Sequence, residues 1–368
     1  MPSVTVLIAA RPGQTGIKAV AAGQALDYPA DKLEIIVARG RQPSAQRNAA
    51  MKAARGQWLY FLDDDSVPPP DNLRRAAPYL SRPEVKMVGG PNLCPPEAPP
   101  LEQVFALVLA NALAFGPSRA RYAAVGEVRA TSEKELILCN LMARRDAMLE
   151  LGGFDESLYP NEENALMDDL RKRGGKLIYD PAFYVYRHPR ASLRAFARML
   201  MTYGRGRAEQ FRLHPTLGSA LNLVPPLFCA YLAALVLLAL LAVFGKLALS
   251  SLAVALVPLA AYGALVLGHV LTMKSPKSNV QSPKSEVRSP KPAAQNPEAS
   301  ERCEGAHSPG AEGGEIGVLQ RAAALLLIVL THVLYGVGFW RGLFTKLRQA
   351  GQPAPGEVVL ERVPVDRQ

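Results

Sequence analysis

Three short apolar runs, separated by stretches with a helical or polar pattern, open the chain. The runs cover residues 4–10, 33–38 and 58–62, and turn-forming or polar residues bound each of them. Runs of this length and composition are typical of buried strands. Helix-like stretches at residues 15–26 and 48–54 connect them. Strand, helix, strand, helix, strand is the pattern of a parallel sheet with right-handed crossovers, so we predict an α/β domain with a mostly parallel sheet that begins with a nucleotide-binding half.

Three much longer apolar segments follow in the second half of the chain. Residues 213–245, 247–273 and 322–340 contain no Lys, Arg, Asp or Glu. About 20 consecutive apolar residues suffice for a helix to cross the hydrocarbon core of a bilayer. We therefore predict three transmembrane helices, centred on residues 223–244, 249–271 and 322–340.

A polar insert, residues 274–318, separates the second and third apolar segments. It is rich in Ser, Pro, Lys and Glu, and it contains three near-repeats of seven residues, each with Ser-Pro-Lys. This composition buries too little apolar surface to offset the entropy lost on folding, and the repeats have no apolar seam of the kind that a coiled coil needs. We expect the insert to be a disordered linker.

No basic segment precedes the first apolar run, which is only about seven residues long, so we expect no signal peptide and a first domain that stays in the cytoplasm.

These patterns divide the chain into five parts. The parts are residues 1–215, a catalytic domain; 216–273, two transmembrane helices; 274–318, the linker; 319–345, the third transmembrane helix; and 346–368, a polar tail.

The side of the membrane on which the tail lies is ambiguous in the sequence. Three full crossings place the tail outside, opposite the first domain. The tail nevertheless begins with Arg341, Lys346 and Arg348, and basic residues favour the cytoplasmic side. Because nineteen uncharged residues suffice to cross a bilayer, we adopt three spans with an outside tail. The alternatives are that the third segment dips into the membrane without crossing it, or that an earlier segment lies in the interface.

The charge of the chain favours a membrane over nucleic acid as its partner. The 42 Lys and Arg residues exceed the 32 Asp and Glu residues, for a net charge of +10. Many arginines lie between Arg187 and Arg212, directly before the first long apolar segment, where they meet anionic headgroups or lipid-linked phosphates. The four cysteines lack the paired spacing of a metal site and fit a reducing compartment. We expect a multi-pass protein of the inner (plasma) membrane.

Three consecutive aspartates, Asp63, Asp64 and Asp65, follow the third short apolar run and precede a proline-rich loop. Open α/β folds bind ligands at the carboxyl ends of their strands. Clustered carboxylates there attract a hard divalent cation such as Mg²⁺ or Mn²⁺, which keeps coordination positions for substrate phosphates. A solvated acidic turn has the same local sequence. The aspartates alone therefore leave both interpretations open.

The order of motifs over the first 215 residues resembles that of the family 2 glycosyltransferases, which have the GT-A fold. The segment with Tyr203-Gly204-Arg205-Gly206-Arg207 is similar to the membrane-bound bacterial members that build exopolysaccharide, the succinoglycan-type transferases among them. The resembling motifs include Ala10-Arg11-Pro12, Gln46-Arg47-Asn48, Asp63-Asp64-Asp65, Asn140, Gly152-Gly153-Phe154-Asp155-Glu156, Asn161-Glu162-Glu163-Asn164, Gly174-Gly175-Lys176-Leu177-Ile178-Tyr179-Asp180-Pro181 and His188.

The resemblance implies an inverting transfer of a sugar from a nucleotide-diphosphate donor to a lipid-linked or membrane-proximal glycan, in surface polysaccharide synthesis. It assigns Asp63 and Asp65 to the metal ion that neutralises the leaving diphosphate, and it assigns Glu163 to the general base that accepts the proton of the attacking hydroxyl. It places the donor nucleotide against Ala10, Arg11, Arg39, Arg41, Arg47, Asp63 and Asp64, and the acceptor or diphosphate against Asn140, Glu162, His188, Arg205 and Arg207.

The chain departs from the family pattern after its second predicted strand. Most members carry an acidic residue there that holds the nucleoside, whereas this chain has Arg39 and Arg41. Either the two guanidinium groups contact phosphate oxygens, or the nucleoside contact comes from elsewhere. His188 and Asn140, taken alone, are also typical of structural polar residues.

Two other functions fit parts of the same sequence. A sugar nucleotidyltransferase also uses an aspartate cluster and Mg²⁺, but it needs a glycine-rich basic loop after the first strand, which residues 9–13 match poorly. A catalytically degenerate transferase domain that acts as a membrane scaffold is the alternative without enzymatic activity. The transfer reaction is the prediction that we carry forward.

Overall fold

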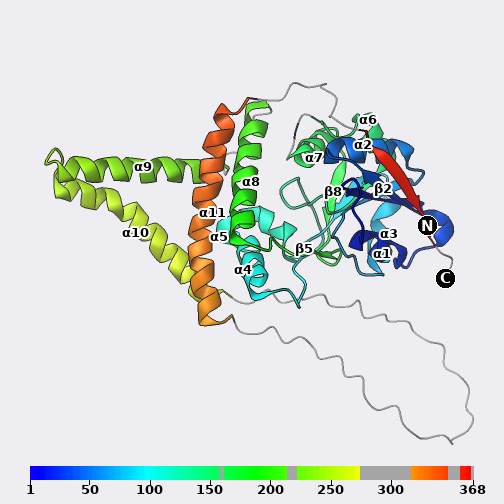
Figure 1. The fold of residues 1–368 in the computed structure, drawn as a ribbon, viewed down its shortest axis with the longest axis horizontal. Coiled ribbons are helices and arrows are strands. Elements are labelled where there is room, and N and C mark those ends of the chain that lie inside the picture. Colours follow the sequence, from blue (N-terminus) through cyan, green and yellow to red (C-terminus); the bar gives the residue numbers. More distant parts are fainter. Residues whose placement is uncertain (157, 159–160, 214–221, 274–315, 347–356, 366–368) are drawn as a thin grey trace, which may run out of the picture.

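The structure, a computed structural model, describes residues 1–156, 158, 161–213, 222–273, 316–346 and 357–365 (Figure 1). The described chain has two parts, a domain built around a sheet and a set of long helices beside it. All but the last three residues of the predicted linker lie outside the described residues.

The central sheet has eight strands in the order β10-β2-β1-β3-β7-β4-β8-β6. Strands β1, β2 and β3 are parallel to one another, and β4 and β8 are parallel further along. This confirms the predicted α/β fold with a mostly parallel core. The strands are β1 (Val4–Ala10), β2 (Leu33–Arg39), β3 (Trp58–Asp63), β4 (Val85–Gly89), β6 (Arg129–Ala130), β7 (Asn140–Arg144), β8 (Lys176–Tyr179) and β10 (Val359–Val363); β5 (Asn92–Leu93) and β9 (Val185–Tyr186) form a small second sheet.

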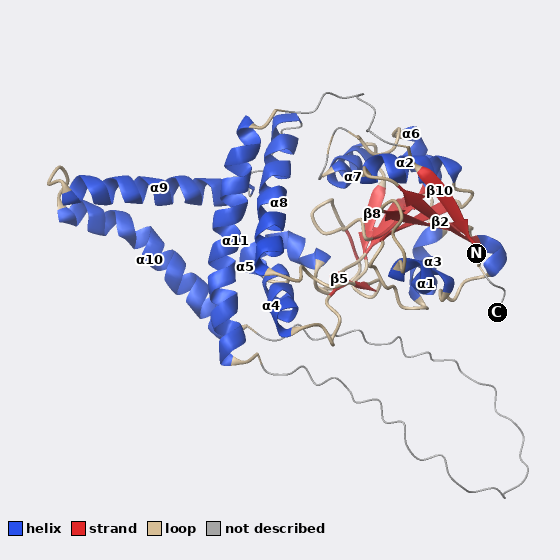
Figure 2. Cartoon of the chain, in the orientation of Figure 1, coloured by secondary structure: helices blue, strands red, loops and turns tan. Residues whose placement is uncertain are grey.

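The first three strands form where they do because both of their faces are buried. Val6 and Ile8 contribute to one core cluster, and Leu7 between them contributes to the cluster on the opposite face. Strands buried on both faces are continuous apolar runs rather than alternating ones, which is the pattern in the sequence. Helices cover both faces of the sheet (Figure 2). These and the neighbouring helices are α1 (Lys18–Gln24), α2 (Pro43–Ala53), α3 (Asn72–Leu80), α4 (Pro100–Leu109), α5 (Ala112–Phe115), α6 (Arg145–Glu150) and α7 (Glu162–Lys172).

Four long helices form the second part of the molecule. Helices α9 and α10 make a hairpin that extends away from the sheet domain, whereas α8 and α11 run side by side next to that domain (Figure 1). Glycines allow the second pair to touch, since an added Cβ on Gly204 would lie 2.0 Å from the carbonyl oxygen of Tyr335. The helices are α8 (Leu193–Leu213), α9 (Val224–Val243), α10 (Leu249–Thr272) and α11 (Val318–Phe344).

Three of these helices, α9, α10 and α11, are long and apolar enough to cross a membrane. Their burial within the protein differs. In the most apolar window of each helix, 11% of the residues of α9 and 6% of those of α10 are buried, compared with 39% for α11. Most apolar side chains of α9 and α10 are therefore not buried by the protein, while much of α11 packs against the rest of the chain.

Part of the predicted polar tail is a strand of the central sheet. Strand β10 pairs with β2 in antiparallel register, from Val359 opposite Arg39 to Val363 opposite Ile35. Two strands that share a sheet lie on the same side of any membrane. Three full crossings by α9, α10 and α11 would separate them, so the expectation of an outside tail was wrong.

Candidate active site

The carboxyl ends of β1, β2 and β3 bring the predicted donor residues together. The strand register places Ala10 opposite Arg39 and Ala9 opposite Asp63, so three neighbouring strands end at one edge of the sheet. This edge is where open α/β sheets bind ligands. Arg11 and Arg41, which follow β1 and β2, are exposed beside it.

A single arginine contacts two of the three aspartates. Arg187 Nη1 lies 3.1 Å from Asp63 Oδ2, and Arg187 Nε lies 2.5 Å from Asp65 Oδ1. Arg47 Nη2 contacts the other oxygen of Asp63 at 3.2 Å. Burial would raise the pKa of Asp63, but the two guanidinium groups more than offset it and hold that pKa below its usual value.

The aspartate pair fits a divalent cation that takes its remaining ligands from a substrate. Among the described residues, no group of three or more His, Cys, Asp and Glu side chains could hold a metal ion by itself. Asp63 and Asp65 nevertheless flank one position, which the cationic head of Arg187 occupies. Carboxylate oxygens are the ligands of Mg²⁺ and Mn²⁺, which are commonly bound by one or two carboxylates together with substrate phosphates and water.

Sequence reasoning placed Arg187 in the basic stretch that meets lipid phosphates and did not connect it with the aspartates, although it named the next residue, His188, for the site. Arg187 follows β9 and reaches the aspartates only because β9 lies beside the end of β3, where Val67 and Tyr186 exchange backbone hydrogen bonds of 2.9 Å. No local pattern in the sequence marks this long-range approach.

Arg39 does have a carboxylate beside it. Its Nε and Nη2 atoms each lie 3.0 Å from Glu361 Oε2, on strand β10. Its Nη1 donates to the carbonyl oxygen of Gln14 at 2.7 Å. The side chain of Gln14 in turn donates to Asp64 Oδ2 at 2.5 Å. A carboxylate from the far end of the described chain therefore lies beside residues 38–41, paired with Arg39.

The two glutamates at the start of α7 have different surroundings. Glu162 is buried, with 3% of its side chain exposed, and its Oε1 accepts from Arg47 Nη1 at 3.1 Å. Burial, and secondly the neighbouring Glu163, raise the pKa of Glu162 to about 7, although Arg47 opposes this rise. Asn161, which precedes them, has a left-handed backbone conformation with φ of 118°.

Glu163 lines a cavity of about 380 Å³ between the sheet domain and the long helices. Arg121 and Arg207 line the same cavity, and the helices contribute mainly apolar and aromatic side chains such as Val224 and Tyr335. Burial, and secondly the charge of Arg121, lower the pKa of Arg207, so an anion between the two guanidinium groups would be stabilised.

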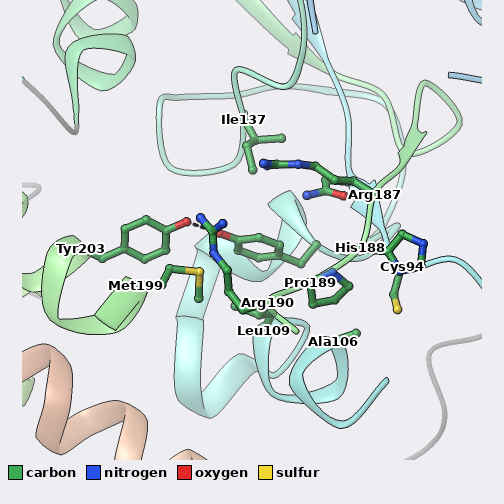
Figure 3. Close-up of a pocket in the computed structure, with 12 residues that line it drawn as sticks. Cys94, Ala106, Leu109, Ile137, Arg187, His188, Pro189, Arg190, Met199 and Tyr203 are labelled. Carbon is green, nitrogen blue, oxygen red and sulfur yellow. Dashed lines mark hydrogen bonds between the residues drawn. The ribbon is translucent and has the colours of Figure 1, made fainter. Parts of the chain in front are cut away.

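A smaller cavity of about 50 Å³ adjoins the larger one (Figure 3). Tyr203 lines both, and its hydroxyl group lies 3.3 Å from that of Tyr122, which also lines both. Arg187 and His188 lie on the opposite wall of the smaller cavity. Tyr122 and Tyr203 therefore lie between the cavity lined by Arg187 and the cavity lined by Glu163.

Residues 1–202 match the model of the glycosyltransferase-like family 2. The chain belongs to this family. Its fold is similar to that of mannosyltransferase PcManGT from Pyrobaculum calidifontis, solved in complex with GDP-Man and Mn²⁺, with a TM-score of 0.50 and 20% identity over 72% of this chain and 81% of that one. A lower similarity, with a TM-score of 0.37 and 11% identity, relates it to residues 1–349 of S. aureus TarS, over 60% and 78% of the two chains. No curated protein matches the chain.

Two residues predicted for the acceptor side of this glycosyltransferase line neither cavity. Asn140 is fully buried, accepts from the hydroxyl group of Tyr60 at 2.9 Å and donates to the carbonyl oxygen of Phe183 at 2.7 Å, which are the contacts of a structural polar residue; its place on the acceptor side stays a prediction. Arg205 lines neither cavity and contacts Glu209 at 3.4 Å, close to α11.

His188 lies at the predicted side, but it has a partner that the sequence did not indicate. Its Nδ1 lies 2.7 Å from Glu102 Oε2 on helix α4, and 39% of its side chain is exposed. Glu162 lies at Arg47 and Arg207 lines the larger cavity, and their roles toward a diphosphate or acceptor stay predictions.

Proposed function

We propose that this glycosyltransferase moves a sugar from a nucleotide-diphosphate donor to a lipid-linked acceptor at the cytoplasmic face of the inner membrane, as a step of exopolysaccharide or other surface glycan synthesis. One observation carries the proposal: the cavity that holds Glu163 and two arginines opens between the sheet domain and the apolar helices. A lipid-linked phosphate needs basic groups and apolar surface together, and this cavity supplies both.

On the donor side, the proposal depends on residues at the carboxyl ends of the first three strands. The similar mannosyltransferase was solved with GDP-Man and Mn²⁺, which supports a nucleotide-sugar donor and a divalent metal ion here. Asp63 and Asp65 would hold the metal ion, whose charge neutralises the leaving diphosphate. Arg47 and Arg187 stand beside the same carboxylates, so their guanidinium groups are placed to donate to diphosphate oxygens.

On the acceptor side, we assign proton transfer to Glu163. A carboxylate within hydrogen-bond reach of the attacking hydroxyl accepts its proton as the new glycosidic bond forms. Glu163 faces the acceptor cavity, while Glu162 is held at Arg47 on the donor side, so the two neighbours have separate tasks. Attack from the face opposite the leaving diphosphate inverts the anomeric centre.

We place the membrane around the α9–α10 hairpin and keep α11 at its surface. A helix of 20 residues such as α9 is about 30 Å long, which matches the hydrocarbon core. Helix α11 packs along α8, which carries five arginines, and such side chains are costly in hydrocarbon. Two crossings also return the chain to the side of the sheet domain, where β10 pairs with β2.

The test is an assay of the purified full chain in lipid nanodiscs with Mn²⁺, a panel of nucleotide sugars and polyprenyl phosphate or polyprenyl diphosphate glycans. We expect release of a nucleoside diphosphate and a glycosylated lipid. Formation of pyrophosphate from a sugar phosphate and a nucleoside triphosphate would instead establish the nucleotidyltransferase, and no turnover with any pair would favour the scaffold.

Substitution of one arginine tests the acceptor assignment. Arg207→Gln should raise the KM for the lipid acceptor by about tenfold or more, because a charge-assisted contact to phosphate is lost, and should leave the donor KM unchanged. Arg198→Gln is the matched control, since Arg198 lies exposed on the same helix. Equal effects of the two substitutions would contradict the lipid phosphate site.

A further inference from the structure

The C-terminal strand β10 lies beside the predicted donor residues. We propose that Glu361 on this strand is a positioning residue for the donor: it fixes the guanidinium group of Arg39 so that Arg39 can contact the donor nucleotide. This inference rests on the proposed function, because it assigns a role in the binding of the same donor.

The contacts of Arg39 hold its guanidinium group from two directions. Glu361 Oε2 accepts from both Nε and Nη2 at 3.0 Å, and the carbonyl oxygen of Gln14 accepts from Nη1 at 2.7 Å. Arg39 is the last residue of β2, opposite Ala10 at the end of β1. The side chain of Arg39 is 24% exposed, so it stays accessible to a ligand at this edge of the sheet.

The same contacts reach the aspartate cluster. Gln14 Nε2 donates to Asp64 Oδ2 at 2.5 Å, and Gln14 Oε1 accepts from the backbone N–H of Arg11 at 3.1 Å. Hydrogen bonds through Arg39 thus join β10 to three segments: the loop after β1, the end of β2 and the loop after β3. A change at Glu361 therefore acts on the donor edge and not only on the tail.

The next residue of β10 provides a natural control. Arg362 Nε contacts Glu34 Oε1 at 3.0 Å, and its Nη2 donates to the carbonyl oxygen of Ala53 at 2.8 Å. Successive side chains of a strand point to opposite faces, so Arg362 holds β10 on the face away from Arg39. Its side chain is 50% exposed and that of Glu361 is 51% exposed, so the two ion pairs are alike in exposure.

Comparison of the two positions separates positioning of the donor from simple attachment of the strand. If β10 only completes the sheet, loss of either ion pair changes the donor Kd by the same factor. If Glu361 orients Arg39, only loss of Glu361 weakens donor binding. Neither substitution should detach β10, since half-exposed ion pairs contribute little to stability and the five-residue backbone pairing remains.

The experiment uses the full chain and measures the Kd for UDP and GDP with Mn²⁺, together with donor KM and kcat. Glu361→Gln should raise the Kd and the donor KM by about 3- to 5-fold with little change in kcat, the upper range expected for one partly exposed charged contact. Arg362→Gln should leave both constants within about twofold, and Glu361→Asp should restore part of the affinity.

A double substitution tests the link to Arg39 directly. Arg39→Gln should weaken nucleotide binding, and adding Glu361→Gln should cause no further loss, because the two residues act together. Additive losses, equal effects of Glu361→Gln and Arg362→Gln, or no effect of Glu361→Gln would overturn this inference alone. A wild-type chain that binds no nucleoside diphosphate would overturn the proposed function, and this inference with it.

Discussion

The guanidinium group of Arg187 and the carboxylate of Asp63 form an ion pair, with Nη1 and Oδ2 3.1 Å apart. Arg187 directly follows strand β9, which positions its guanidinium group beside a carboxylate that is also predicted to bind a metal ion. Arg187 already balances that charge, so a metal–donor complex bound as proposed would have to compete for the carboxylate. The proposal therefore predicts that the loop after β9 influences donor binding.

Substitution of Asp65 tests the metal assignment. Asp65→Ala should abolish turnover and Mn²⁺-dependent binding of nucleoside diphosphate, since one of two carboxylates is lost. The side chain is 43% exposed, so unfolding should be almost unaffected. Asp27→Ala serves as the control, because Asp27 is 49% exposed and pairs with Arg74 on the surface. Unchanged Mn²⁺-dependent binding in Asp65→Ala would rule the assignment out.

Substitution of Glu163 tests the general base. Glu163→Gln keeps the shape of the side chain but cannot accept the proton, so kcat should fall by about 10²-fold or more with donor Kd unchanged. Asp168→Asn is the matched control, because Asp168 lines the same cavity but pairs with Lys172 at 2.8 Å. A Glu163→Gln enzyme with nearly native kcat would reassign the residue to acceptor positioning.

The raised pKa of Glu162 predicts a pH-dependent stability. The folded protein holds this proton up to about pH 7, whereas the unfolded chain releases it near 4.5. The contribution of Glu162 to the free energy of unfolding is therefore fully present below about pH 4.5 and is lost as the pH rises through about 7. Between pH 5 and 7.5 the Tm of the wild type should fall, by on the order of a few °C, relative to that of Glu162→Gln. Parallel Tm curves for the two proteins would contradict this.

Cysteine labelling distinguishes two crossings from three. In a variant whose native cysteines are replaced by serine, a cysteine at Lys246, between α9 and α10, should react with a membrane-impermeant reagent on intact cells. A cysteine at Gln368 should be protected and should react only after lysis. Labelling at Gln368 on intact cells would restore the three-span topology.

The sequence predicts the first three strands well for a physical reason. Observed β1 matches the predicted residues 4–10, and β2 and β3 each extend only one residue beyond the predictions. Their burial on both faces leaves continuous apolar runs, which sequence reasoning detects. The helix predicted at residues 15–26 is shorter, because Gly13 and Gly16 have positive φ and α1 begins only at Lys18.

Strand β10 could not be predicted in the same way. Three of its five residues are apolar, but four of the five are exposed, so burial does not give it the long apolar run of the first three strands, and its pairing with β2 depends on backbone hydrogen bonds to a segment about three hundred residues earlier. The apolar pattern of α11 was found, but hydropathy does not distinguish contact with lipid from contact with α8. That contact is visible only in the structure, where a Cβ added to Gly338 would lie 2.2 Å from the carbonyl oxygen of Met201 on α8.

The position of β10 in the chain affects how the enzyme is made. On the ribosome, β10 emerges after every other element that the structure describes, so β2 remains an open sheet edge while the apolar helices are synthesised and inserted. An open edge exposes unpaired N–H and C=O groups to other chains. A translation product that stops before Val359 would therefore carry its aspartates and Glu163 without the partner of Arg39, and would be prone to aggregation. Completion of synthesis thus precedes full assembly of the donor site.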